Sequence, residues 1–185
     1  MEFIDLRLSL LDPTDLRGIP FFDSANKSAI WAKPEFLPNS NSQAFGILFL
    51  DEINSAPPTV QAAAYQLILD RKIGEYTLPM NYAIVAAGNY ESDRGVTYRM
   101  PTPLANRFVH LDFELDFEEW KSWAYESKID TRIISFLSYK PQNLFTFDAK
   151  AKEKSFATPR SWSFVNDILN SNLQIEFLKD VISGA

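Results

Sequence analysis

"GILFLDEINSAPP", residues 46–58, decides the fold class of this 185-residue chain. Its first five residues are apolar or small without alternation, which is typical of a central parallel strand covered on both faces. Two carboxylates, Asp51 and Glu52, follow at once, and a polar, proline-rich turn comes after them. The stretch therefore predicts a buried strand that ends in a pair of acids.

The segments on either side of this strand predict an α/β sheet. Residues 3–11 alternate apolar and polar side chains and predict a strand, and residues 82–89 predict a second central strand. Between the acids and residue 82, five residues have the spacing of one helix face: Val60, Ala63, Ala64, Leu67 and Ile68. We expect Asn54 or Ser55 to cap this helix and Gly74 to end it.

Three other segments connect these elements. Residues 12–44 are rich in proline, asparagine and serine, with one predicted short helix at residues 24–32. Long ordered loops of this kind are usually functional. Residues 73–82 predict a hairpin that leads into the second central strand, with residues 79–81 at the turn. Residues 104–115, "LANRFVHLDFEL", predict a short helix that leads into a further strand.

Helical patterns replace the strands after this point. They cover residues 116–128, 129–140 and 158–182. Strands that alternate with helices, followed by helices alone, indicate a sheet and a separate helical part. The sequence therefore predicts a parallel-sheet α/β domain at residues 1–115 and a small α-helical domain at residues 116–185.

Composition excludes several classes of function. The net charge of −6 and the pI near 4.8 argue against a nucleic-acid partner, because phosphate binding needs clustered Lys and Arg. The chain has no cysteine, which excludes thiolate metal sites and disulfides. Its one histidine, His110, lies in a predicted strand, where we expect a structural role. No apolar run approaches the roughly 20 residues of a membrane span, so we expect a cytoplasmic protein without a membrane span.

The acid pair at the end of the buried strand has a chemical interpretation and a structural one. Parallel sheets bind ligands at the carboxyl ends of their strands, and Mg²⁺ prefers one or two carboxylates together with substrate phosphates. One acid would hold the metal, and the other would accept a proton from an attacking water. Alternatively, one acid caps the next helix and the other is solvated. A metal-dependent phosphoesterase that uses only Asp51 and Glu52 is a further alternative.

Three more polar residues stand at defined positions. Asn89 ends the neighbouring predicted strand, where its amide could orient the same water or simply form a turn. Arg107 follows a short predicted helix at a domain edge. Arg160 lies in the first turn of a helix that Thr158 would cap. A cation near a helix N-terminus needs a compensating anion, which could be a phosphate or a surface carboxylate.

In this order, "GILFLDE", "AAGN", "LANRF" and "TPRSW" resemble the AAA+ ATPases. The longer stretches "DPTDLRGIP", "ILFLDEINSAPPTVQAAAYQLILDRKIGEYTLP", "AAGNYESDRGVTYRMPTPLANRF" and "FATPRSW" resemble the MoxR type, a dynein-related class with an insert in its second helix. The resemblance covers most of the chain, from about residue 6 to residue 170. It implies a P-loop NTPase-like core followed by a helical lid.

The resemblance also implies a role for each site residue. Asp51 would be the Walker B ligand of Mg²⁺, and Glu52 the catalytic base. Asn89 would be sensor 1, Arg107 the arginine finger and Arg160 sensor 2. The cofactors implied are ATP and Mg²⁺.

The partners implied are other copies of the chain and protein clients. The arginine finger would act across a subunit boundary in a homo-oligomeric ring, commonly a hexamer. The ring would remodel or mature a client, such as a partner with a von Willebrand A-type domain. Usual contact sites in the family are the pre-sensor hairpin, here near residues 73–82, and the helix-2 insert, here within residues 12–44.

The chain departs from the family at the phosphate-binding loop. That loop has the pattern G-x-x-x-x-G-K-[ST], yet none of the six glycines precedes a lysine. In the family it lies ahead of the strand predicted at residues 3–11. We therefore expect this chain alone to bind ATP weakly or not at all, to lack hydrolysis, and to have an open sheet edge. The alternative is a non-catalytic, degenerate subunit or interaction module that contributes Arg107 to a neighbour.

Overall fold

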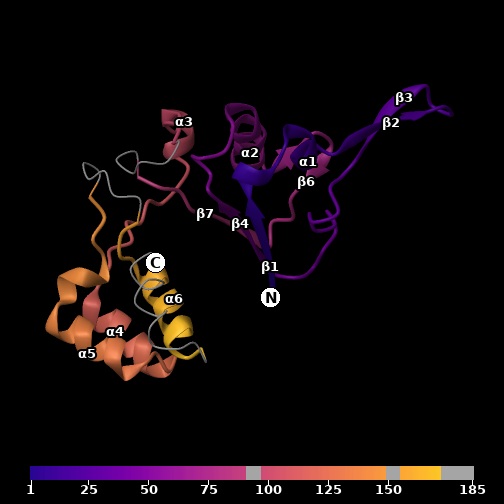
Figure 1. Cartoon of the computed structure of the whole chain (residues 1–185). Helices are drawn as coiled ribbons and strands as arrows, with labels where there is room; N and C mark the ends of the chain where they lie inside the picture. Colours follow the sequence, from indigo (N-terminus) through magenta and orange to yellow (C-terminus); the bar gives the residue numbers. More distant parts are fainter. Residues whose placement is uncertain (91–96, 149–154, 172–185) are drawn as a thin grey trace. The chain divides into compact units, whose positions relative to one another are not determined.

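The computed structural model describes residues 1–90, 97–148 and 155–171. Its contacts divide the chain into two units, residues 1–110 and residues 111–185. The first combines strands and helices, and the second is helical (Figure 1). The functional boundary expected between residues 115 and 116 stays a prediction.

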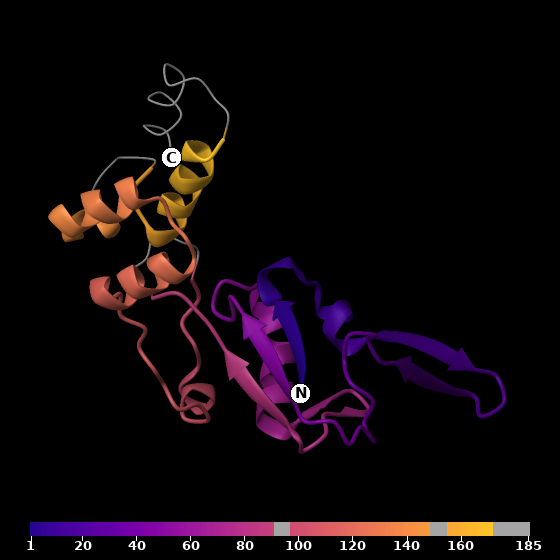
Figure 2. The ribbon, with the colours of Figure 1, turned by 90° about the horizontal axis from the view of Figure 1, so that it is seen from below.

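The first unit is built on a three-stranded parallel sheet in the order β1-β4-β7. Its strands are β1 (Glu2–Arg7), β4 (Gly46–Asp51) and β7 (Tyr82–Ala86). Figure 2 shows them side by side with their arrowheads in a common direction. The expected α/β fold, with a parallel sheet and a helical part, is therefore confirmed. The first strand is shorter than predicted, because the 3₁₀ helix η1 (Leu8–Leu10) follows it.

The sheet is well covered on one face only. Leu48 and Leu50 of β4 are fully buried and share a core with α2 (Pro58–Asp70). On the opposite face, Phe3 is 61% exposed and stacks on the half-buried Phe49. The expectation that β4 is covered on both faces was wrong. The physical reason is that α2 lies over one face, and the described elements leave the other face partly open.

Helix α2 forms as predicted, but both of its expected ends were wrong. Its N-cap is Pro57, because two consecutive prolines fix the backbone angles that begin a helix. Arg71, with φ of 55°, ends it in the left-handed region. Gly74, with the same φ, instead forms the turn of a short hairpin between β5 (Lys72–Ile73) and β6 (Tyr76–Thr77). A hairpin is thus present, but it spans Lys72 to Thr77 and turns at Gly74, not at the predicted residues 79–81.

The excursion before β4 contains a second hairpin where we predicted a helix. After α1 (Pro13–Arg17), strands β2 (Ile19–Asp23) and β3 (Ser28–Ala32) pair antiparallel and extend away from the sheet (Figure 1). The helix expected at residues 24–32 was wrong, because Asp23 closes a turn there. Its carboxylate accepts hydrogen bonds from the Ala25 N–H and the Asn26 amide.

The strand predicted within residues 104–115 does not form. The short helix is present as α3 (Thr102–Ala105), but no strand follows it. A ring nitrogen of His110 lies 2.8 Å from the Ala105 carbonyl oxygen, and the histidine is exposed rather than part of a sheet. A strand needs a neighbour to receive its backbone hydrogen bonds, and none of the described segments pairs with this one.

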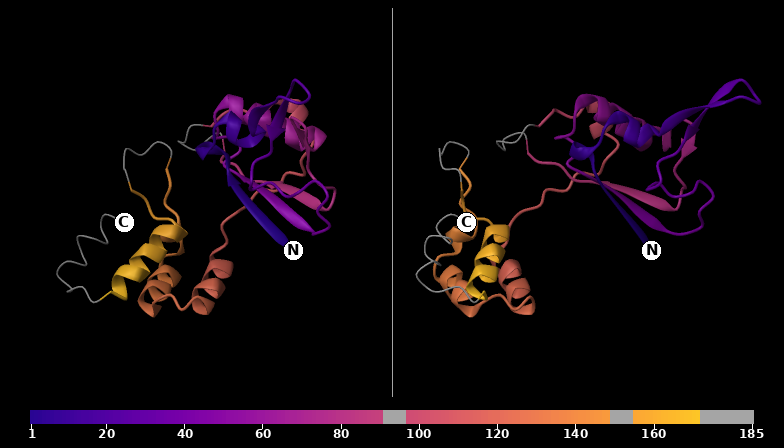
Figure 3. Two further views of the ribbon diagram at one scale, coloured as in Figure 1. Left: turned by 90° about the vertical axis from the view of Figure 1, so that its right-hand side faces the viewer. Right: turned by 45° about the vertical axis from the view of Figure 1, so that its right-hand side comes forward.

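The second unit packs three helices around their own core (Figure 3). These are α4 (Phe117–Glu126), α5 (Thr131–Tyr139) and α6 (Pro159–Leu169), and the 3₁₀ helix η2 (Pro141–Leu144) follows α5. Buried residues from all of them form this core: Trp120, Ala124, Ile133, Ile134, Leu137, Leu144 and Val165. Residues 172–182 of the last predicted helix lie outside the described residues. Among the described helices, none has the length and apolar character needed to cross a membrane.

Asp130 caps the N-terminus of α5 and forms an ion pair with Arg132. Its carboxylate accepts hydrogen bonds from the Arg132 N–H at 2.8 Å and from the Arg132 guanidinium at 2.6 and 2.9 Å. These bonds lower the pKa of the Asp130 carboxyl from 3.8 to about 2. Because the folded value is the lower one, the ionised carboxylate stabilises the fold above about pH 4. That stabilisation is lost as the pH falls through about 2.

We expect Asp130→Ala to lower the free energy of unfolding of the helical unit by about 1 kcal/mol at pH 7. The difference from the wild type should shrink between pH 4 and pH 2 as the wild-type carboxylate is protonated. Asp130→Asn is the matched control, because it keeps a capping oxygen and removes the charge. Urea unfolding can be followed by fluorescence, since three of the four tryptophans, Trp120, Trp123 and Trp162, lie in this unit. If the difference in unfolding free energy between the wild type and Asp130→Ala did not change with pH, the stabilising role of the ionised Asp130 carboxylate would be contradicted.

Candidate functional site

The acid pair lies where the central strand ends. Asp51 is the last residue of β4, and Glu52 leaves the strand with φ of 55°. The Glu52 N–H donates to Asp51 Oδ1 at 2.9 Å, and the Glu52 carbonyl accepts from the Ser55 N–H at 3.0 Å. Both carboxylates are therefore held by a tight turn at the carboxyl edge of the sheet, which is where parallel sheets bind ligands.

Arg7 and Ser9 complete the surroundings of the acids. Arg7 Nε lies 3.6 Å from Asp51 Oδ2 and 3.8 Å from Glu52 Oε1, and the Ser9 hydroxyl donates to Glu52 Oε2. Sequence reasoning missed both residues. Parallel pairing of the strands predicted at residues 3–11 and 46–50 could have pointed to Arg7, because Arg7 lies directly opposite Asp51 in the register of β1 and β4.

Asn89 lies at the same edge of the sheet, three residues after the end of β7. The Asn54 side chain holds it there. The Asn54 amide donates to the Asn89 carbonyl at 2.6 Å, and its oxygen accepts from the Asn89 N–H at 3.0 Å. Asn54 was expected as a helix cap; instead it joins the loop after Glu52 to the loop after β7. Asp51, Glu52 and Asn89 thus follow neighbouring strands of one sheet, as predicted.

The two arginines lie in different units. Arg107 is exposed just after α3 in the first unit, and its N–H donates to the Leu104 carbonyl at 2.9 Å. Arg160 is exposed in the first turn of α6 in the second unit. The expected Thr158 cap is confirmed, because its side chain accepts from the Ser161 N–H at 3.0 Å. Roles of these arginines in one site stay predictions.

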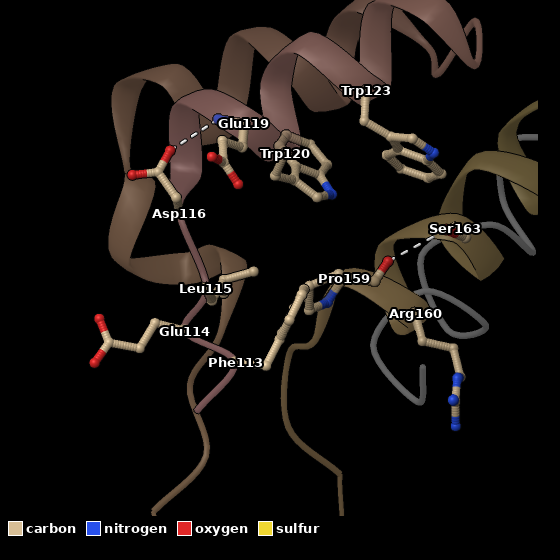
Figure 4. Close-up of a pocket in the computed structure, with 10 residues that line it drawn as sticks. All are labelled: Phe113, Glu114, Leu115, Asp116, Glu119, Trp120, Trp123, Pro159, Arg160 and Ser163. Carbon is tan, nitrogen blue, oxygen red and sulfur yellow. Dashed lines mark hydrogen bonds between the residues drawn. The ribbon is translucent and has the colours of Figure 1, made fainter. Parts of the chain in front are cut away.

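The second unit carries a cavity of about 500 Å³ beside Arg160 (Figure 4). Trp120, Trp123 and Pro159 form its apolar walls, and Asp116 and Glu119 lie at its rim. The Trp120 indole N–H is buried and has no hydrogen-bond partner among the described residues. The cavity therefore offers aromatic surfaces and an exposed guanidinium to a ligand that stacks and carries an anion.

The donors at the strand end fit one kind of metal site. Mg²⁺ binds through one or two carboxylates when substrate phosphates supply further ligands, and Asp51 and Glu52 provide that number. The described residues contain no group of three or more acidic, histidine or cysteine side chains that could hold a metal alone. Arg7 forms an ion pair with each acid and compensates one of their two charges, so a cation at Asp51 would compete with this arginine.

No protein-family model and no curated protein matches this chain. Among solved structures, it is similar to a chain from Cytophaga hutchinsonii ATCC 33406 that is described as a "putative ATPase". The identity is 19% and the TM-score is 0.45, and the match covers 91% of this chain and 46% of that one. This chain thus spans less than half the length of that chain. A similarity of this size carries no functional conclusion.

Proposed function

We propose that this chain is part of an AAA+ ATPase of the MoxR type, which binds and hydrolyses ATP to remodel or mature protein partners when complete. The observation that supports this most is the arrangement at the carboxyl edge of the sheet. Asp51 and Glu52 end the central strand, and Asn54 holds Asn89 beside the loop that follows them. The ordered sequence motifs support the same proposal.

In the proposed reaction, water attacks the terminal phosphate of ATP and gives ADP and phosphate. Glu52 accepts the proton of that water on its carboxylate, and the Asn89 amide orients the water. Asp51 would hold Mg²⁺, which would compensate the charge of the phosphates. Arg107 acts on the site of a neighbouring copy, and Arg160 contacts the phosphates from the helical unit.

The exposed hairpin β2–β3 is the proposed client contact. Five of its large apolar side chains are 38–73% exposed: Ile19, Phe21, Phe22, Ile30 and Trp31. Alternate residues of a strand point to opposite faces, so the neighbours Phe21 and Phe22 make both faces of the hairpin apolar. Exposed apolar surface of this kind marks protein interaction sites. Assembly of the complete protein into a homo-oligomeric ring belongs to the same proposal.

Residues 1–185 alone should bind MgATP weakly or not at all and should show no hydrolysis. The acids and Asn89 act at the far end of a nucleotide that a phosphate-binding loop would hold, and this sequence has no such loop. Titration calorimetry with MgATP and a phosphate-release assay would check this expectation. Tight binding with one site per chain would contradict it.

The proposed activity itself is tested on an extended chain. If the DNA upstream of Met1 encodes a phosphate-binding loop in frame, the extended protein should hydrolyse ATP. Glu52→Gln in that protein should lower kcat at least about 100-fold, since general bases contribute 10² or more, and should leave ATP binding in place. Ser55→Ala is a matched control on the same loop. Hydrolysis that survives Glu52→Gln would contradict the proposed role of Glu52.

A second candidate is a non-catalytic AAA+ subunit or interaction module. The contacts of Arg7 and Ser9 favour it, because they already satisfy the two acids that would serve a metal and a water. This candidate gains if the upstream DNA encodes no phosphate-binding loop. It then predicts that the chain stimulates hydrolysis by an intact neighbour and that Arg107→Ala abolishes this stimulation.

A further inference from the structure

Asn54 joins the acid turn, residues 51–55, to the loop that follows β7. Its side chain makes two hydrogen bonds to the backbone of Asn89: the amide donates to the carbonyl at 2.6 Å, and the oxygen accepts from the N–H at 3.0 Å. The backbone extends the same contact, because the Ile53 N–H donates to the Ala87 carbonyl at 3.0 Å. Together these bonds fix the point from which the Asn89 side chain extends.

Gly88 shows how closely the two loops approach each other. A Cβ atom on Gly88 would lie 2.7 Å from Asn54 Oδ1 and 3.0 Å from Asn54 Cγ. The φ of Gly88 lies outside the left-handed region, so its backbone is open to other residues as well. The approach of the Asn54 side chain is therefore what requires a glycine here. Alanine at this position would have to displace that side chain.

Asn54 also holds a segment further along the chain. Its carbonyl accepts from the Tyr98 N–H at 2.6 Å. Helix α3 begins at Thr102, and Arg107 lies just after this helix, in the same unit as Asn54. One residue is thus a common anchor for the loop that carries Asn89 and for the segment that leads to Arg107.

We propose that Asn54 is a positioning residue, which sets the Asn89 amide relative to the acid pair and attaches the segment that leads to Arg107 to the acid turn. Asn54 acts through these residues and contacts neither the water nor the phosphates. Its side-chain partner is 35 positions away in the sequence, so the two bonds do more than close a local turn. The consequence for hydrolysis rests on the function proposed above, whereas the anchor can be measured in residues 1–185.

Amide hydrogen exchange on residues 1–185, followed by NMR, tests the anchor. In Asn54→Ala the Asn89 N–H loses its acceptor, and its exchange should become about tenfold faster, as expected for the loss of one hydrogen bond. The Tyr98 N–H is the discriminating amide, because its acceptor is a backbone carbonyl that alanine keeps. We expect it to exchange faster as well. Ser55→Ala, on the same turn, should change neither rate. A Tyr98 amide that keeps its wild-type rate in Asn54→Ala would overturn the common anchor.

Gly88→Ala provides a second route to the same change. Its methyl group should displace the Asn54 side chain and speed exchange at Asn89 as Asn54→Ala does. The double variant Asn54→Ala/Gly88→Ala should be no worse than either single variant, because removal of the Asn54 side chain makes room for the methyl group. Additive effects of the two substitutions would show that they act independently and would overturn the close contact as their cause.

Kinetics of the extended protein test the positioning role. Asn54→Ala should lower kcat at least about tenfold, since misplacing a catalytic group by about 1 Å can cost 10²-fold. It should leave KM for ATP unchanged, because Asn89 orients the water and does not hold the nucleotide. Asn54→Asp keeps the acceptor for the Asn89 N–H and should recover part of kcat. A purely structural role would reduce the amount of folded protein without changing kcat per folded molecule.

The outcomes separate this inference from the proposed function. If Glu52→Gln abolishes hydrolysis while Asn54→Ala retains the wild-type kcat, the positioning role is overturned and the proposed function stands. An extended wild type without hydrolysis would instead contradict the proposed function. The exchange rates of Asn89 and Tyr98 would then decide the anchor by themselves.

Discussion

Replacing Gly18 with alanine is expected to lower the free energy of unfolding of the α/β unit by about 3 kcal/mol. Gly18 has φ of 84° and ψ of −172°, a region that is open almost only to glycine. A Cβ atom there would lie 1.9 Å from the Ala32 carbonyl oxygen. Backbone strain and a clash with a neighbouring backbone therefore act together, at the base of the β2–β3 hairpin.

Gly74→Ala is the matched control for this prediction. Gly74 also has a positive φ, of 55°, but no atom lies within 4 Å of the position that a Cβ would take. Gly74→Ala should therefore lower the free energy of unfolding only by the backbone strain, about 1 kcal/mol. Thermal unfolding of both variants, with hydrogen exchange of residues 19–32, measures the difference. Equal destabilisation would show that the contact with Ala32 has no energetic role.

Leu50→Ala is expected to lower the free energy of unfolding by about 3 kcal/mol as well, through a different cause. Leu50 is fully buried on the central strand, and its carbonyl accepts the Ala87 N–H at 2.9 Å. Truncation would leave a cavity in the core that β4 shares with α2, and the strands paired on both sides of β4 limit the relaxation that could fill it. The protection of residues 46–51 against hydrogen exchange should fall accordingly.

The control for Leu50 is the same substitution at an exposed position. Leu10→Ala removes the same atoms from a side chain that is 74% exposed, and it should change stability by less than about 0.5 kcal/mol. Loss of protection in both variants would mean that the central strand is not the stable part of this unit.

Local patterns predicted the elements that local interactions determine. Helices α2, α4, α5 and α6 have apolar residues at helical spacing, and the Thr158 cap of α6 is followed by a proline, so sequence neighbours alone favour these helices. The buried strand β4 was equally clear from its continuous apolar run. The placement of Asp51, Glu52 and Asn89 at one edge followed from the strand ends.

The predictions that were wrong concern residues whose structure depends on partners far away in the sequence. Residues 107–115 have the composition of a strand, but a strand forms only beside another strand. The residues next to this segment in the sequence do not show whether a distant strand is there to pair with it. The hairpin β2–β3 was mistaken for a helix because its cross-strand pairs, such as Phe21 with Ile30, lie nine residues apart. Arg7 and Ser9 escaped notice for a related reason, since the pairing of β1 with β4 joins residues that are 44 positions apart.

The left-handed backbone of Glu52 explains how two adjacent carboxylates can both lie near the same cation. In an extended strand, successive side chains point to opposite faces, so Asp51 and Glu52 would diverge. The positive φ of Glu52 breaks that alternation at the first residue beyond the strand. Both carboxylates then converge on a single cation, as their distances to Arg7 Nε show. One backbone torsion thus brings to the same side two carboxylates that an extended strand would point in opposite directions.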